Sequence, residues 1–422
     1  MTTIQASAHL PLVPIRADEP IDTVEKLYSH LYLAAKLELS TIPLYLYAGY
    51  SIKTQNASQW APGPGAFRLI KSIVIEEMLH LSLARNLIIA IGYGDSVPFC
   101  DPLFVPAYPG DMLNRIPKLQ LRLAPLTREL VRDVFMEFEL PAKADAAPES
   151  EEYHTIGQFY QAIHDGFGNL CGAGKANPWG DPDRTRELFK SNRPDLQYVS
   201  AYWNQGGGGE PQLVHDLRSA LTAINTIVEQ GEGMNPDLQK VPLRPEAPQP
   251  GQFEEPHYQK FQRIARGWEP IGEVYPVPEN PRVEDYPAGP VRDLGLLCNA
   301  AYTYVLRLLD EVYSSSWEDV DGGRTSRRYG LERKFIAAMQ GLLFGVVNQL
   351  VRVPIDKGTY KGCHAAPTFE FYDGFPEGEP MTDHLRELCD KVVPHFPGLG
   401  GDNSVLWLIG KMPPLTLARP YA

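Results

Sequence analysis

The sequence predicts a mainly α-helical protein, in which a four-helix bundle with a long crossover insertion is followed by a second helical region. Three observations support this fold class. Apolar residues recur every three or four positions over long stretches, a short turn rich in Gly and Pro joins the two most regular stretches, and prolines concentrate between the helical segments. Such spacing is typical of amphipathic helices that pack around a shared core.

The first predicted helix runs from about Thr23 to Tyr50. Its apolar positions follow spacings of three and four and are Leu27, Leu31, Ala35, Ile42 and Tyr45. Glu38 lies in the middle of this stripe, so the spacing places its carboxylate on the buried face of the helix.

The second predicted helix follows the turn around residues 61–65, and its stripe contains Ile70, Ile73, Ala84 and Leu87. Glu77 and His80 fall on the same stripe. A buried ionised carboxylate costs roughly several kcal/mol unless a cation or hydrogen bonds compensate it. Glu76 lies about 100° off the stripe, which indicates a solvated residue or one placed behind the ligands.

A long crossover is predicted after Gly92, because five prolines between positions 98 and 117 interrupt any regular element. Short helices are expected at 127–138 and 155–167. A third strong helix is predicted from Gln212 to about Glu232, and a fourth begins near Pro256, since proline is tolerated at the first helical position. The stripe of the third helix is Leu213, Leu217, Leu221, Ile224 and Val228.

The chain changes character after a second proline-rich linker at 270–290. Residues 294–313 and 332–351 are long and mostly apolar, so we expect a buried antiparallel helix pair, followed by a loop-rich tail from Pro354. The predicted organisation is therefore a metal-binding bundle over residues 20–270 and a C-terminal helical region, 290–422, packed on it.

The pair Glu77 and His80 forms an ExxH unit, whose side chains project together from one helix and can reach one metal ion. Glu38 of the neighbouring helix would supply a third ligand. Bundles that bind two metal ions through carboxylates use this arrangement twice, with one Glu from each of two helices and one ExxH from each of the other two.

The second half of such a site should come from the third and fourth helices. Glu232 continues the stripe of the third helix, whereas Glu229 lies about 140° from Ile224, so Glu232 is preferred. Glu254 and His257 form a second ExxH, but Pro256 leaves the direction of Glu254 open and makes His257 the safer ligand. The candidate metal ligands are Glu38, Glu77, His80, Glu232, His257, Glu229 and Glu254.

Five segments of the chain resemble, in the same order, the ferritin-like domain of the iminophenyl-pyruvate dimer synthases of violacein and rebeccamycin type biosynthesis. The segments are residues 37–47, 75–80, 155–160, 230–233 and 257–261. The resemblance continues weakly through 299–302, Met339 and 366–370. It implies a ferritin-like bundle, an iron cofactor and oxidative coupling of two imines derived from aromatic 2-oxo acids.

These observations predict an iron-dependent oxidative enzyme of specialised, secondary metabolism that acts on a small, amino-acid-derived aromatic substrate. The alternative is a non-catalytic ferritin-like protein that binds metal or has a structural role. A set of carboxylate and imidazole ligands suits iron or manganese better than copper or structural zinc. The sequence leaves open whether the iron site is mononuclear or dinuclear, whether manganese replaces iron and whether haem is present, and it assigns no catalytic residue.

Composition restricts the partners. Lys and Arg number 39 against 52 Asp and Glu, the net charge is −13, and no basic run occurs, so nucleic acid and anionic membranes are poor partners. We expect a small-molecule substrate and dioxygen instead. The absence of a secretory pattern, of a long apolar run and of paired cysteines predicts a cytoplasmic protein, and the sequence does not determine its oligomeric state.

Overall fold

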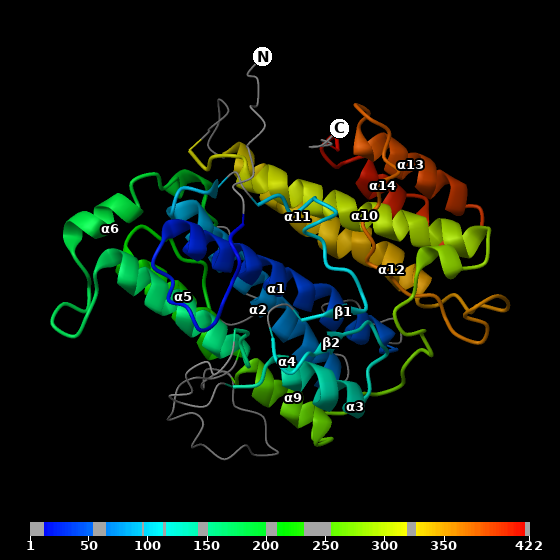
Figure 1. The fold of residues 1–422 in the computed structure, drawn as a ribbon. Helices are drawn as coiled ribbons and strands as arrows, with labels where there is room; N and C mark the ends of the chain where they lie inside the picture. The colour runs from blue at the N-terminus through cyan, green and yellow to red at the C-terminus, as the bar shows by residue number, and fades with distance from the viewer. Residues whose placement is uncertain are drawn as a thin grey trace.

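The computed structural model describes residues 12–53, 65–94, 97–112, 115–141, 151–199, 209–231, 255–318 and 326–417. In these ranges the chain is mainly α-helical, as predicted (Figure 1). Two antiparallel strands of two residues each, β1 (Gly110–Asp111) and β2 (Gln120–Leu121), pair within the crossover. Within all of the ranges that the structure describes, no helix is both long and apolar enough to cross a membrane.

Helices α1 (Val24–Ser51) and α2 (Gly65–Ala90) pack along each other and form the centre of the bundle. Thr23 caps α1, since its side chain accepts a hydrogen bond from the backbone N–H of Lys26. Pro43 lies inside α1 without ending it. Both helices match the predicted ones, and α2 begins several residues before its predicted stripe.

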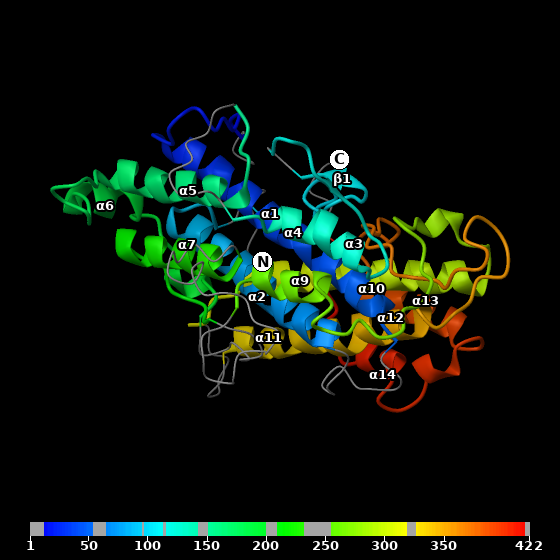
Figure 2. The same ribbon diagram turned by 90° about the horizontal axis from the view of Figure 1, so that it is seen from below.

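Two series of shorter helices cover the α1–α2 pair (Figure 2). One consists of α3 (Arg128–Leu130), a π-helical segment (Val131–Phe135), α4 (Met136–Phe138) and α5 (Ile156–Cys171), which is followed by α6 (Pro182–Leu188). The other consists of α7 (Leu217–Gly231) and α9 (His257–Ala265). Helices α5 and α7 close one half of the bundle, and α9 packs on α2 and on the α3–α4 segment in the other half. The third side of the bundle is therefore formed by two successive helices, α4 and α5, and the fourth side by α7 and α9, so that both sides are interrupted.

The predicted start of the third helix at Gln212 is wrong. Helix α7 begins at Leu217, because the Asp216 carboxylate accepts the backbone N–H of Ser219 at 2.8 Å and so caps the helix there. Leu213, predicted as the first buried position, is 39% exposed. Pro256 is the N-cap of α9 rather than its first helical residue.

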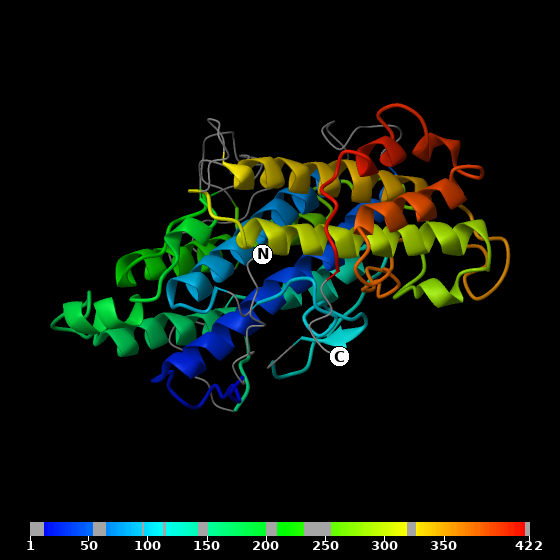
Figure 3. The same ribbon diagram turned by 90° about the horizontal axis from the view of Figure 1, so that it is seen from above.

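The C-terminal region is built on two long helices that lie side by side (Figure 3). One is α10 (Pro290–Tyr313), and the other runs through α11 (Arg327–Ala337), a π-helical segment (Ala338–Leu343) and α12 (Phe344–Leu350). The described tail from Pro354 is rich in loops, as predicted, and it also contains two helices that were not predicted, α13 (Met381–Val392) and α14 (Val405–Ile409). Among the described residues of the whole chain, short 3₁₀ turns occur at Pro194–Leu196, Val283–Asp285 and Pro397–Leu399.

The two regions share one hydrophobic core. The Asp310 carboxylate of α10 accepts the backbone N–H groups of Phe99 and Cys100, at 2.7 and 3.0 Å. The Tyr50 ring at the end of α1 lies 5.8 Å from the Phe344 ring of α12. These contacts join the C-terminal region to the crossover and to the end of α1.

Candidate metal centre

Five ionisable side chains meet inside the bundle, where its third and fourth sides are interrupted. Glu38 comes from α1, Glu77 and His80 from α2, Glu139 from the residue after α4, and His257 is the first residue of α9. Each is at most 2% exposed. Such a concentration of buried charge requires either a cation or protons.

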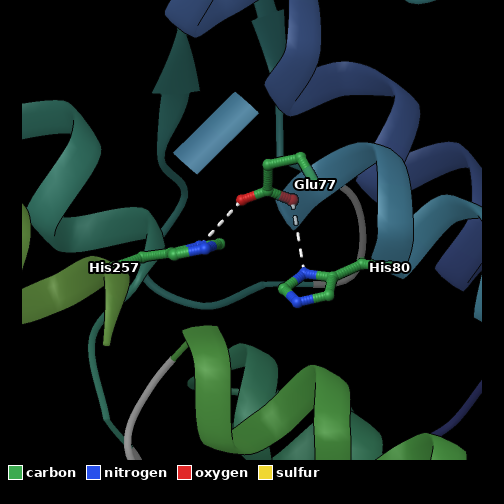
Figure 4. A group of neighbouring side chains, drawn as sticks. All are labelled: Glu77, His80 and His257. Atoms are coloured by element: carbon green, nitrogen blue, oxygen red, sulfur yellow. Dashed lines mark ion pairs between the residues drawn. The ribbon is translucent and has the colours of Figure 1, made fainter. Parts of the chain in front are cut away.

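Glu77 lies between the two histidines, and each of its carboxylate oxygens faces one of them (Figure 4). Glu77 Oε1 lies 3.0 Å from His257 Nδ1, and Oε2 lies 3.6 Å from His80 Nδ1. The two imidazole rings are 5.3 Å apart. Donor atoms of the three residues lie within 4.8 Å of one another, which is close enough for shared metal ligation.

A second carboxylate lies beside each histidine. Glu38 Oε2 is 3.5 Å from His80 Nδ1, and Glu139 Oε1 is 3.6 Å from His257 Nδ1. The centre thus consists of two similar halves. The His80 half contains Glu38 and the His257 half contains Glu139, and Glu77 contributes one oxygen to each.

The outer nitrogen of each imidazole is already hydrogen-bonded. His80 Nε2 lies 3.0 Å from Gln230 Oε1, and His257 Nε2 lies 2.8 Å from Glu76 Oε2. Both Nδ1 atoms therefore face the carboxylates of the centre. His257 Nδ1 is buried and makes no hydrogen bond. A hydrogen bond to one imidazole nitrogen and a ligand position at the other is the usual arrangement of metal-binding histidines.

Two buried tyrosines orient the outer carboxylates. The Tyr160 hydroxyl of α5 donates to Glu38 Oε1, and the Tyr45 hydroxyl of α1 donates to Glu139 Oε1 at 2.6 Å. Burial, together with these carboxylates, raises the pKa of both phenols well above the ordinary value. Both tyrosines therefore remain hydrogen-bond donors at neutral pH.

A cavity of about 10 Å³ lies at the centre, which is room for about one water molecule. Its polar lining is Glu38, Glu77, His80, Glu139 and Tyr160, and its other lining residues are Phe138, Ile156, Ile227, Val228 and Gly231. Gly231 lines this space, and a Cβ atom there would lie in van der Waals contact with Glu139 Oε2, at 3.4 Å. A small molecule in the cavity would contact the ligand groups on one side and apolar groups on another.

Protons partly balance the charge of the metal-free centre. Burial raises the pKa of Glu38 to about 7. Burial and the charge of Glu77 raise the pKa of Glu139. Burial would lower the pKa of His80, but Glu38 and Glu77 outweigh it and raise that pKa to about 9. Burial likewise opposes ionisation of Glu77, yet the neighbouring histidines hold its pKa well below the usual value.

The residues fit a bound metal ion. Three carboxylates and two imidazoles form a donor set suited to iron or manganese. His257 Nδ1 faces two carboxylates, Glu77 at 3.0 Å and Glu139 at 3.6 Å, and a cation among them would satisfy all three groups. His80 and His257 would hold metal through Nδ1, together with Glu77 and with the carboxylate of each half, Glu38 or Glu139.

The structure brings together four of the seven predicted ligands, Glu38, Glu77, His80 and His257. Glu229 is not among them. It is exposed on α7, because the neighbouring Ile227, Val228 and Gly231 occupy the buried face. Glu232 and Glu254 lie outside the described residues.

Glu139 is the residue that the sequence prediction missed, because the helix was expected to end at Phe138. A usable signal was present. Val131 and Phe135 are buried, and one more step of four residues leads to Glu139. Its backbone N–H still bonds to the carbonyl of Phe135 at 3.0 Å, so the helical spacing continues to this position.

Two curated proteins are similar in sequence to this chain. The chain is 26% identical to a dichlorochromopyrrolate synthase of Lentzea aerocolonigenes over 90% of its length. It is 24% identical to a 2-imino-3-(indol-3-yl)propanoate dimerase of Chromobacterium violaceum over 83% of its length. It spans only 39% and 34% of the length of these two relatives.

A crystal structure of a ferritin-like protein from Caulobacter vibrioides has 25% sequence identity and a TM-score of 0.49, and the match covers 76% of this chain and 96% of that one. The ferritin-like family model matches residues 31–266, which is more than half of the chain and includes all five residues of the centre. The chain therefore belongs to the ferritin-like family.

Proposed function

We propose that this chain is an iron-dependent oxidative enzyme of specialised metabolism that uses dioxygen and acts on a small aromatic 2-imino acid or its 2-oxo acid precursor. The position of Glu77 carries this proposal. Its two oxygens face the Nδ1 atoms of two histidines whose outer nitrogens are already bonded. Ligands arranged in this way are ready for two metal ions that share one carboxylate.

Bound iron would supply the electrons that are exchanged with dioxygen. The chain's own groups would prepare the site. Tyr160 and Tyr45 hold the outer carboxylates in position, and the apolar residues around the cavity exclude bulk water from it. The cavity has room for about one water molecule beside Glu38 and Glu139.

The names of the two relatives suggest the substrate class. One relative is a dimerase of 2-imino-3-(indol-3-yl)propanoate, and the other is a synthase of dichlorochromopyrrolate. Joining two imine molecules through a new C–C bond removes two hydrogen atoms, which dioxygen can accept as hydrogen peroxide. An aromatic 2-imino acid is therefore the first class of substrate to test.

The test is oxygen uptake by protein that is purified without oxygen and loaded with Fe(II). Aromatic 2-oxo acids mixed with ammonium provide the imines in equilibrium. We expect uptake with iron-loaded protein and one of these substrates, none with metal-free protein, and unchanged uptake in Glu229→Ala, which alters an exposed residue near the centre. Equal turnover by metal-free protein without oxygen would contradict the proposal. Iron uptake without any substrate-dependent reaction would favour the non-catalytic alternative.

A further inference from the structure

The two histidines of the centre differ in the group behind them. His80 Nε2 faces the neutral amide of Gln230 at 3.0 Å, whereas His257 Nε2 faces the carboxylate of Glu76 at 2.8 Å. Glu76 is 1% exposed. The ammonium group of Lys260, which is 4% exposed, lies 2.9 Å from one oxygen of this carboxylate and 2.7 Å from the other.

This difference affects which nitrogen of each ring is available to a metal ion. Lys260 donates to both oxygens of Glu76, so this carboxylate is placed as a hydrogen-bond acceptor, and His257 Nε2 is placed to donate to its Oε2 atom. In the neutral ring, the free electron pair is then on Nδ1 and points into the centre. An amide can either accept or donate, so Gln230 can pair with either tautomer of His80.

We propose that Glu76, held by Lys260, is a positioning residue that makes the His257 half of the centre the tighter metal position. The His80 half, supported by Gln230, fills second. A carboxylate hydrogen-bonded to a ligand imidazole makes the imidazole a stronger ligand, and loss of such a partner lowers metal affinity by roughly 10- to 100-fold. The assignment depends on the metal centre proposed above, and it concerns the order of filling rather than the reaction.

Lys260 has a separate role in this arrangement. Its positive charge balances the charge of the Glu76 carboxylate, which lies directly behind His257 and next to Glu77 in the chain. Its ammonium group also donates to Ser72 Oγ at 3.0 Å, so it is held on α2 beside Glu76. Replacing Glu76 alone would leave a buried ammonium group without this carboxylate. The clean test therefore neutralises both residues together.

The experiment is an anaerobic titration of the metal-free full chain with Co(II), in which ligand-field absorption reports how many ions bind, how tightly and in what ligand environment. We expect the wild-type protein to bind Co(II) in two resolved steps, with His257→Asn abolishing the tighter one. In the Glu76→Gln, Lys260→Met double variant, the affinity of the first step should fall roughly 10- to 100-fold, while that of the second step stays unchanged. Lys260→Arg retains the positive charge and should retain both steps.

The converse variant is Gln230→Glu, which places a carboxylate behind His80. It should raise the Co(II) affinity of the second step and so reduce the difference in affinity between the two steps. Circular dichroism and thermal melting of each metal-free variant show whether the bundle still folds. Two wild-type steps of equal affinity, or equal weakening of both steps in the double variant, would overturn the assignment. If wild-type protein binds no Co(II) or Fe(II), the proposal of a metal centre is wrong. If it binds in two steps whose affinities do not change in the Glu76→Gln, Lys260→Met variant, only the present inference is wrong.

Discussion

Glu77 and His257 lie 3.0 Å apart, from Oε1 to Nδ1, although most of the crossover, α5 and α7 separate them in the chain. The second oxygen of Glu77 faces His80. This carboxylate is therefore shared by both halves of the centre, whereas Glu38 and Glu139 each belong to one half.

The shared position of Glu77 predicts unequal effects of alanine substitutions on metal content. Glu77→Ala should remove nearly all bound metal, whereas Glu38→Ala should reduce an occupancy of about two ions per chain to about one. His80→Ala should resemble Glu38→Ala. The measurement is elemental analysis after reconstitution with Fe(II), with circular dichroism to verify folding. Full occupancy in all three variants would show that the metal binds elsewhere.

The direction of α7 predicts different outcomes for two neighbouring glutamates. Glu229→Ala should leave metal binding unchanged, because this side chain is exposed. Glu232→Ala should weaken binding, because the position continues the buried stripe of Ile224 and Val228 by a further four residues. Titration of both variants with Fe(II) decides the question. Loss of binding in Glu229→Ala alone would mean that the end of α7 is rotated relative to its described position.

Metal affinity should fall as the pH falls. In the metal-free centre, Glu38 and Glu77 raise the pKa of His80 to about 9, and burial raises that of Glu38 to about 7. Below these values the groups hold protons that must leave before a metal ion binds, so each displaced proton lowers the apparent affinity by about tenfold per pH unit. Mn(II) titrations at a series of pH values, with free Mn(II) measured by electron paramagnetic resonance, give the slope. An affinity independent of pH below about 7 would contradict these protonation states.

Tyr160→Phe tests the hydrogen bond that orients Glu38. A hydrogen bond to a charged group contributes roughly 1.5–3 kcal/mol, so the variant should bind metal more weakly in the His80 half. Tyr304→Phe is the matched control, since it removes a buried hydroxyl that bonds to the carbonyl of Pro413 at 2.8 Å in the C-terminal region. The control should lower thermal stability without changing metal affinity. An equal loss of metal affinity in both variants would assign the effect to folding instead.

Gly231→Ala tests whether the cavity is used in the reaction. The added methyl group would lie 3.4 Å from Glu139 Oε2 and take up part of the space for about one water molecule. We expect metal content to be retained while substrate-dependent oxygen uptake falls by about tenfold, equivalent to about 1.4 kcal/mol in the barrier. Gly330→Ala is the control, because its Cβ would meet nothing within 4 Å. Unchanged uptake in Gly231→Ala would show that the reaction does not need this space.

Much of the helical architecture could be predicted from local sequence. The α1 and α2 stripes were predicted with Glu38, Glu77 and His80 on their buried faces, because an amphipathic helix repeats its environment every three to four residues. The same spacing was present in two places where no helical residue had been predicted. It leads from Phe135 to Glu139 and through Met381, Leu385 and Cys389 in α13.

The sequence by itself determined the helix faces and therefore which side chains are buried. Only the tertiary structure decided how these faces combine. Periodicity within a helix contains no information about a partner far away in the chain. It therefore could not show that two successive helices, α4 and α5 on one side and α7 and α9 on the other, meet the α1–α2 pair beside the centre. It also could not show that Glu76 lies behind His257, because this contact depends on how α9 packs against α2 and on the buried charge of Lys260.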